Sequence, residues 1–318
     1  MRDGQVVYSN YSGHANVELN VPVTADTVFQ IQSITKTFTA TAIMMLVEEG
    51  KVSLDDPVGR HLDGTPESWK ATTVRHLLSH TSGIKDFINE PTASLRVDVS
   101  EQEVLAATAP RPLNFAPGEK YAYSNTGYHL LAMIIRKVTG KFYGDFLAER
   151  IFKPLGMDHT RVQELSAVVP GRAAGYLWRD KLTNGGYVAQ SILSYGGGGI
   201  LSTASDLAKW DAALRGEKLL KKATLEQMWE KTTLNDGSKS NYGLGWVVNE
   251  VNGRRCVQHS GGHVTGFQSF MRRYLDDGLT VIVLANQSGK ADPGKIAEQV
   301  AGMFDPSLAP PGTGTVGR

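Results

Sequence analysis

The order of the expected elements along the 318-residue chain predicts an α+β fold, in which helices flank an antiparallel sheet built from both chain ends. Short strand-like runs occur near the N-terminus and again between residues 242 and 286, and the stretch between them reads mainly as helices. No internal repeat interrupts this order. We therefore expect residues 1–58 and 238–305 to form the sheet region, residues 59–237 a mainly helical region, and residues 306–318 a disordered tail rich in Pro, Gly and Thr.

The N-terminal residues alternate loosely between apolar and polar side chains, so residues 5–12 and 14–19 are expected to be strands. Residues 1–8 read as the turn and second strand of a hairpin whose first strand is missing. On this expectation, a version of the protein that starts upstream is more stable. No signal peptide is visible, and the sequence assigns the chain to neither the cytoplasm nor the periplasm or medium.

Apolar residues at helical spacing predict the helices, and shorter apolar runs predict the later strands. Gly50 follows the first helix as a stop signal, and Thr203-Ala204-Ser205-Asp206 reads as a capping box. Four prolines break up residues 84–122. The expected helices cover residues 33–49, a segment that starts at 74 and ends before 82, and residues 126–140, 142–151, 207–214 and 295–303. The expected strands cover residues 242–251, 255–259, 267–274 and 279–286.

Composition excludes several classes of function. Hydrophobic residues make up 41% and charged residues 20% of the chain, as in ordinary globular proteins. Lys and Arg number 33 against 32 Asp and Glu, and no basic cluster stands out, which argues against nucleic acid as a partner. No stretch approaches the roughly 20 apolar residues that a membrane-spanning helix needs. The sequence leaves the oligomeric state open.

No metal or organic cofactor is expected. The single cysteine, Cys256, allows neither an intrachain disulfide nor a cysteine-based metal site. Two histidine pairs, His76 with His80 and His259 with His263, have i, i+4 spacing but lack the glutamate of a zinc protease helix. The four glycines at 196–199 are not followed by the lysine of a phosphate-binding loop, so they are interpreted as a wall of a cleft.

The strongest candidate for chemistry is the start of the first helix. Ser33 and Lys36 are three residues apart, so on a helix they share one face and an amine lies beside a hydroxyl. This arrangement can activate a serine as a nucleophile. The alternative is that Ser33 only caps its helix, which is the usual role of serine at that position.

Two further motifs add to this candidate. Tyr123 and Asn125 lie in a loop before a helix, where a tyrosine can shuttle protons and an asparagine can orient a substrate amide. His259-Ser260-Gly261-Gly262 lies at the end of an expected strand, where glycines let the backbone approach a ligand. The backbone amides of Ser33 and Gly262 are candidates for an oxyanion hole.

Ser33-x-x-Lys36, Tyr123-x-Asn125 and His259-x-Gly261 occur in the order found in the group of class C β-lactamases, D-Ala-D-Ala carboxypeptidases and family VIII esterases. The chain resembles this group over residues 3–305, and the resemblance implies a β-lactamase/transpeptidase-like fold. The motifs between also resemble the group: Thr27-Val28-Phe29, residues 50–57, residues 76–83, Pro154-Leu155-Gly156-Met157 and residues 196–207.

The resemblance implies a serine hydrolase that cleaves carboxylic esters or related acyl compounds through an acyl-enzyme on Ser33. Lys36 and Tyr123 share the general-base role, and the sequence does not divide it between them. Asn125, His259, Ser260 and Gly261 position the substrate, and His259 also biases the protonation of Tyr123. The substrate is a small ester or a short peptide.

The third motif departs from the Lys-Thr-Gly of true β-lactamases, because His259 replaces the lysine. This departure moves the expected substrate away from β-lactams. The alternative function is a D-amino-acid peptidase of the carboxypeptidase or aminopeptidase type. Weaker alternatives are a β-lactamase, an acyltransferase and a non-catalytic sensor of peptidoglycan or β-lactams.

Overall fold

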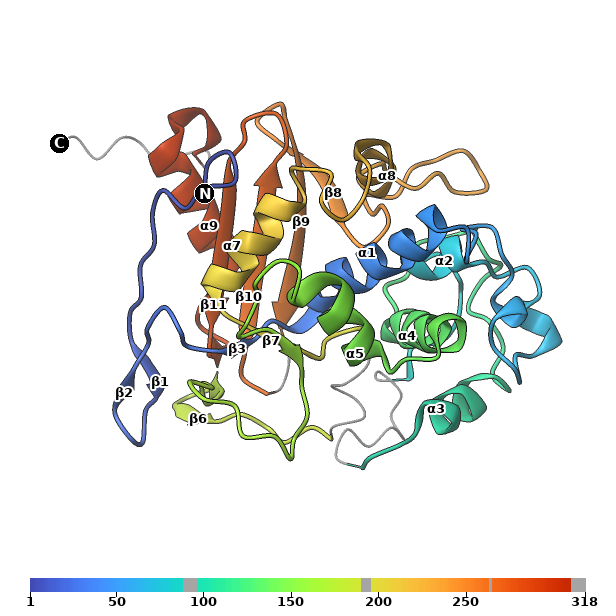
Figure 1. Cartoon of the computed structure of the whole chain (residues 1–318), viewed down its shortest axis with the longest axis horizontal. Helices are drawn as coiled ribbons and strands as arrows, with labels where there is room; N and C mark the ends of the chain where they lie inside the picture. Colours follow the sequence, from blue (N-terminus) through green and yellow to red (C-terminus); the bar gives the residue numbers. More distant parts are fainter. Residues whose placement is uncertain (88–96, 190–195, 263–264, 310–318) are drawn as a thin grey trace.

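The computed structural model describes residues 1–87, 97–189, 196–262 and 265–309, and it confirms the predicted α+β fold (Figure 1). The main sheet is antiparallel with the strand order β11-β10-β9-β8. Its strands are β8 (Val247–Val251), β9 (Arg254–Gly262), β10 (Gln268–Tyr274) and β11 (Thr280–Ala285). All four overlap the strands expected from the sequence.

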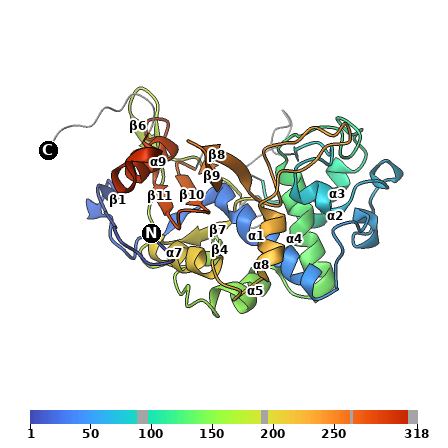
Figure 2. The same ribbon diagram turned by 90° about the horizontal axis from the view of Figure 1, so that it is seen from above.

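Helices cover both faces of the sheet. Helix α9 (Pro293–Phe304) packs on β10 and β11, and α7 (Ala204–Ala213) packs on β11 from the opposite face, as Figures 1 and 2 show. Successive side chains along β10 point to opposite faces of the sheet and join the apolar clusters on both sides. Phe270 joins the apolar cluster under α9, and Met271 joins the large core that also holds Trp210 of α7.

Helix α1 (Thr35–Glu48) runs from the sheet into the helical part of the molecule, where it packs against α4 (Asn125–Thr139) (Figure 1). All its residues from Thr35 to Leu46 are buried, because the sheet, α4 and neighbouring loops surround it. Gly50 follows the end of α1 and has a φ of 69°, in agreement with its prediction as a helix stop signal. A fully enclosed helix gives its first turn a fixed position.

The remaining elements are short. The helical part also contains α2 (Val74–Leu78), α3 (Glu101–Thr108), α5 (Tyr143–Leu147), which continues into the π-helical turn η5 (Ala148–Phe152), and α8 (Lys222–Met228). Three small sheets have the strand orders β1-β2, β12-β5-β6 and β3-β7-β4. Their strands are β1 (His14–Asn16), β2 (Val21–Pro22), β3 (Phe29–Gln30), β4 (Arg161–Val162), β5 (Tyr176–Trp178), β6 (Leu182–Asn184), β7 (Ile200–Ser202) and β12 (Gln287–Ser288). Single 3-10 turns are η1 (Gln32–Ile34), η2 (Val58–Arg60), η3 (Glu67–Trp69) and η6 (Pro306–Leu308).

Several expectations for individual elements were wrong. Residues 5–12 form no strand, because their backbone does not reach a partner strand and their side chains lie largely exposed. Helices α3 and α8 were not expected at all. Thr203 caps α7 by accepting from the Asp206 amide, but the Asp206 carboxylate binds Thr160 and Lys209 instead of completing a capping box. Of the expected tail, residues 306–308 form η6 with Leu308 buried, and residues 310–318 lie outside the described residues.

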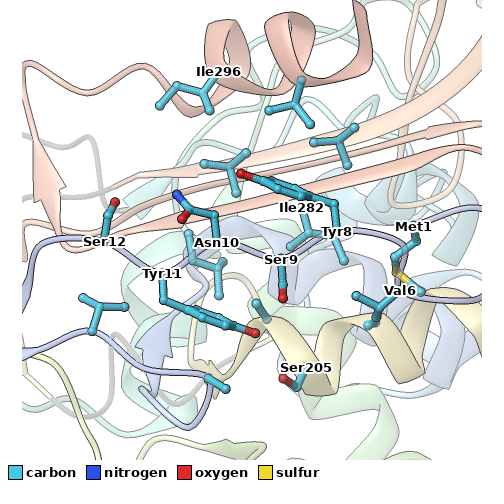
Figure 3. A pocket seen from close by; sticks show the side chains of 18 of the residues that line it. Met1, Val6, Tyr8, Ser9, Asn10, Tyr11, Ser12, Ser205, Ile282 and Ile296 are labelled. Atoms are coloured by element: carbon cyan, nitrogen blue, oxygen red, sulfur yellow. The ribbon is translucent and has the colours of Figure 1, made fainter. Parts of the chain in front are cut away.

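A groove of about 440 Å³ lies between β11, α7, α9 and the N-terminal segment (Figure 3). Its lining is largely apolar and includes Tyr8, Ile282 and Ile296. The N-terminal ammonium of Met1 donates to the carbonyl of Thr280, and the Thr280 amide donates to the carbonyl of Met1. None of the candidate site residues lines this groove.

Candidate active site

Ser33 lies in the tight turn η1, immediately before α1. The preceding residue, Gln32, is buried and has a φ of 51°, a left-handed conformation that is strained for a residue with a side chain. The Gln32 amide group donates to Gln30 Oε1 at 2.8 Å and to Thr265 Oγ1 at 2.9 Å, and these bonds hold the strained turn. No side-chain capping bond is formed at either η1 or α1, so the alternative that Ser33 is a helix cap is wrong.

The η1 turn is held against the sheet by close backbone packing. Ser269 Oγ of β10 donates to the carbonyl of Ile31 at 2.7 Å. A Cβ atom at Gly261 of β9 would lie 2.6 Å from the same carbonyl oxygen and 2.7 Å from Gln32 Cβ. Only glycine fits there. Gly261 therefore brings the third motif directly beside the η1 turn that carries Ser33.

Lys36 is fully buried, and its ammonium lies among neutral oxygen atoms. Lys36 Nζ donates to Ser33 Oγ at 3.2 Å, to Asn125 Oδ1 at 2.8 Å and to the Gly197 carbonyl at 2.7 Å. Burial lowers the pKa of Lys36 from its ordinary value to about 7, and the charge of Asp86 opposes this shift. A lysine of this kind is a usable proton acceptor near neutral pH.

Tyr123 lies over the same site from the loop before α4. The residue as a whole is 37% exposed, and the Lys36 Nζ atom lies 4.7 Å from the centroid of its ring. The phenol hydrogen bonds to Ser33, which favours ionisation, but burial has the larger effect and raises the pKa of Tyr123 well above its ordinary value. The phenol is therefore protonated at neutral pH.

His80 stabilises the loop that carries Tyr123. It is buried with a φ of 58°, and its Nδ1 accepts from the Ser124 amide at 3.1 Å. Its ring packs against those of Tyr123, Tyr128 and Tyr242, with centroids 4.3, 5.1 and 4.6 Å away. Burial lowers the pKa of His80 well below its usual value, so this imidazole is neutral. The missing glutamate had favoured structural or substrate-side roles over metal ligation for the His76–His80 pair, and the contacts of His80 are structural.

Asn125 is the first residue of α4, and Ser124 caps that helix by accepting from the Gly127 amide. The Asn125 side chain bridges two charged groups, because its Oδ1 accepts from Lys36 and its Nδ2 donates to Asp86 Oδ2 at 3.0 Å. Asp86 was missed at the sequence level. The only signal was its place three residues after Gly83, at the end of a stretch already matched to the family.

His259 in β9 is buried, and both of its ring nitrogens are engaged within the protein. Nδ1 lies 2.6 Å from the Ser260 carbonyl and therefore donates, which leaves Nε2 to accept from the Tyr242 hydroxyl at 3.0 Å. Burial lowers the pKa of His259 to about 3. The third motif therefore carries no positive charge at neutral pH, and the ring centroids of His259 and Tyr123 lie 6.4 Å apart.

Ser260 and Gly262 lie at the exposed end of β9, which packs against the η1 turn. A Cβ atom at Gly262 would meet nothing closer than 3.7 Å, so this end of the strand is open. His263, one half of the second histidine pair, lies outside the described residues. Within the described ranges, no cluster of three or more potential metal ligands occurs, and no helix is long and apolar enough to cross a membrane.

The sequence profile of the family described as "Beta-lactamase" matches residues 1–302. The chain is 36% identical over 303 residues to penicillin-binding protein 4* of Bacillus subtilis, covering 89% of this chain and 66% of that protein. Over the first three curated relatives, the chain spans between 61% and 72% of their length.

Two solved structures are similar over most of the chain. The octameric penicillin-binding protein homologue from Pyrococcus abyssi matches with a TM-score of 0.78 and 32% identity, over 95% of this chain and 71% of that one. The D-amino acid amidase from Ochrobactrum anthropi SV3, solved with L-phenylalanine amide, matches with a TM-score of 0.75 and 29% identity, over 93% and 87%.

Proposed function

The chain belongs to the beta-lactamase family, and from this premise we propose that it cleaves small acyl compounds through an acyl-enzyme formed on Ser33. Its class is that of a serine hydrolase related to penicillin-binding proteins. The observation that carries the proposal is the buried amine of Lys36, 3.2 Å from Ser33 Oγ and surrounded by neutral oxygens. Few structural roles would justify burying a lysine without a carboxylate in direct contact.

Acylation begins when the neutral Lys36 amine takes the proton of Ser33 Oγ as the oxygen attacks the substrate carbonyl. The backbone amides of Ser33 and Gly262 receive the developing oxyanion. Lys36 is the better base of the two candidates because its pKa is lowered to about 7, whereas that of Tyr123 is raised.

The protonated phenol of Tyr123 then serves as the proton donor to the leaving group. As the bond between the carbonyl carbon and the leaving group breaks, the proton that Lys36 took from Ser33 makes good the one that Tyr123 gave up, so the acylation step leaves no net charge behind. In deacylation, water replaces the leaving group and loses a proton to the same pair. The acid product leaves, and Ser33 Oγ regains its hydrogen.

The neutral third motif favours substrates that place no carboxylate beside His259. His259 carries no charge at neutral pH, so it offers no ion pair to the carboxylate of a β-lactam or a C-terminal D-amino acid. Small carboxylic esters fit this site, with Asn125 and the exposed end of β9 as the positioning groups. Positioning by His259 acts through Tyr242 and the backbone of Ser260.

A second candidate is an amide of a D-amino acid. An amine leaves only when protonated, and the protonated Tyr123 beside Ser33 supplies that proton. The similarity to a D-amino acid amidase favours the same substrate.

The test is Ser33→Ala against wild type, with Ser166→Ala in an exposed loop as the matched control. Turnover of a short p-nitrophenyl ester, D-phenylalanine amide and nitrocefin is measured together with covalent labelling by a fluorophosphonate. We expect Ser33→Ala to abolish turnover and labelling, and Ser166→Ala to keep both. Labelling that persists in Ser33→Ala, or a wild type that neither labels nor turns over any substrate, would overturn the proposal.

A further inference from the structure

A carboxylate lies behind the catalytic lysine, separated from it by a single amide group. Asp86 Oδ2 accepts from Asn125 Nδ2 at 3.0 Å, and Asn125 Oδ1 accepts from Lys36 Nζ at 2.8 Å. The other carboxylate oxygen, Oδ1, accepts from the Thr126 amide at 3.2 Å and from Thr126 Oγ1 at 3.3 Å. An unbroken series of hydrogen bonds therefore connects Asp86, through Asn125 in the first turn of α4 and then Lys36, to Ser33 Oγ.

We propose that Asp86 is a positioning residue for Ser33 acylation, which fixes the orientation of the Asn125 amide and thereby holds the Lys36 amine against Ser33. The inference rests on the proposed function of Ser33 and Lys36. Asp86 itself touches neither the substrate nor the nucleophile.

The orientation argument follows from the chemistry of a primary amide. One side of the Asn125 amide accepts hydrogen bonds and the other side donates them. Because an ionised carboxylate only accepts, Asp86 can bind only the NH₂ side, so the oxygen must face Lys36. With an amide in place of the carboxylate, Asn125 can turn over and present its NH₂ group to Lys36 Nζ, which removes one of the three bonds that hold the amine.

The spacing of the charges fits the same role. A carboxylate in direct contact would keep Lys36 protonated, as in a buried salt bridge. The intervening amide leaves Asp86 close enough to raise the pKa of Lys36 but too far to prevent its lowering to about 7. The start of α4 holds Asp86 in place, because Thr126 binds it through both backbone and side chain and also accepts from the Phe87 amide.

Other titratable groups also face Lys36, and none of them can replace Asp86. His80 lies on the loop after α2 and His259 on β9, and burial lowers the pKa of both so that they are neutral. Tyr123 and Tyr128 lie within 5.4 Å of the amine by ring centroid, and burial keeps both phenols protonated. Compared with these groups, Asp86 is the one carboxylate, and its charge raises the pKa of Lys36.

The test compares Asp86→Asn with the wild type, with Asp63→Asn as the matched control, because Asp63 makes only an exposed ion pair with Lys137. Single-turnover labelling of Ser33 by a fluorophosphonate is measured from pH 5.5 to 9, together with thermal unfolding. We expect Asp86→Asn to slow labelling about 10²-fold at its best pH. We also expect its acidic limb to move to lower pH, because loss of the negative charge lowers the pKa of Lys36 further.

The second part of the test repeats the comparison in the Asn125→Ala variant, where the side-chain amide that Asp86 orients is gone. Adding Asp86→Asn to that variant should slow labelling far less than it does in the otherwise unchanged protein. Equal slowing in both backgrounds would overturn the inference, and so would an unmoved acidic limb or wild-type labelling in Asp86→Asn. Absence of Ser33-dependent labelling in the wild type would instead overturn the proposed function.

Discussion

Two buried cations, Lys36 and Arg273, have opposite surroundings. Lys36 is 0% exposed and Arg273 is 2% exposed. Every hydrogen bond that Lys36 donates ends on a neutral oxygen atom. Arg273 donates from Nε to the buried carboxylate of Asp211 at 2.6 Å.

The Arg273 site joins the sheet to a helix. Arg273 lies on β10 and Asp211 on α7, and Asp211 Oδ1 also accepts from Thr280 Oγ1 of β11 at 2.8 Å. Arg215 binds the second carboxylate oxygen at 3.2 Å, and the Arg273 guanidinium lies 4.9 Å from the ring centroid of Trp229. This cluster ties α7 to two strands.

The two sites differ in whether a carboxylate contacts the buried cation directly, and this determines whether the cation can exchange a proton. Burial lowers the pKa of both side chains, and a carboxylate opposes the shift in both. Asp211 is in direct contact, so Arg273 stays charged and serves stability. Asp86 acts only across the Asn125 amide, so the pKa of Lys36 falls to about 7 and the amine can exchange a proton.

The largest expected effect comes from Lys36→Met. Removal of a general base should lower kcat/KM by about 10²–10⁴-fold. The same change should raise the free energy of unfolding by about 1–4 kcal/mol below pH 7, because a poorly compensated buried charge disappears. Between pH 7 and 10.5 the unfolded chain holds a proton that the folded chain lacks, so wild-type stability rises with pH and the gain from methionine shrinks.

Arg273→Met is the matched control for Lys36→Met, since it also replaces a buried cation by methionine. It leaves Asp211 without its main partner and should lower the free energy of unfolding by about 3–5 kcal/mol. Urea unfolding at pH 6 and at pH 10 checks both variants. Equal signs for the two substitutions would contradict the comparison.

The second effect comes from Asp211→Asn, which leaves the Arg273 charge buried without a carboxylate. The free energy of unfolding should fall by about 3–5 kcal/mol, while Ser33 labelling per folded molecule stays unchanged. Asp206→Asn is the control on the same helix, because its cationic partner Lys209 is 44% exposed and can turn to water. A larger loss in Asp206→Asn than in Asp211→Asn would contradict this account.

The sequence predicted most of the fold and the placement of Lys36 beside Ser33, and what it did not predict has a physical cause. The proximity of Ser33 and Lys36 could be predicted because both residues lie within one helical turn. Strands β8–β11 could be predicted because their apolar runs are continuous. Asp86 and His80 were not readable as site residues, since their contacts with α4 and the Tyr123 loop depend on tertiary packing. The raised pKa of Tyr123 could not be predicted either, because its main cause is burial, and burial cannot be read from a motif.

The smallest expected effect is the pH dependence of the wild type, which is about tenfold per pH unit. With Lys36 as the base, kcat/KM for a p-nitrophenyl ester should be level above pH 7 and fall tenfold per unit below it, because the protonated amine cannot accept the Ser33 proton. The groups that face Lys36 do not produce this limb. His259 titrates at about 3 and His80 well below its usual range, and burial raises the pKa of Tyr123, Tyr128 and Tyr242.

The control for this limb must separate protonation of the base from loss of fold. The guanidinium of Arg273 keeps its proton in this range, so far-UV circular dichroism should stay constant from pH 5.5 to 8 while the rate falls. Lys36→Met should lose the limb together with the activity, and its residual rate should be flat over the same range. A wild-type rate that is level from pH 5.5 to 8 would mean that Lys36, like Arg273, does not lose its proton in this range. Tyr123 would then be the remaining candidate for the general base.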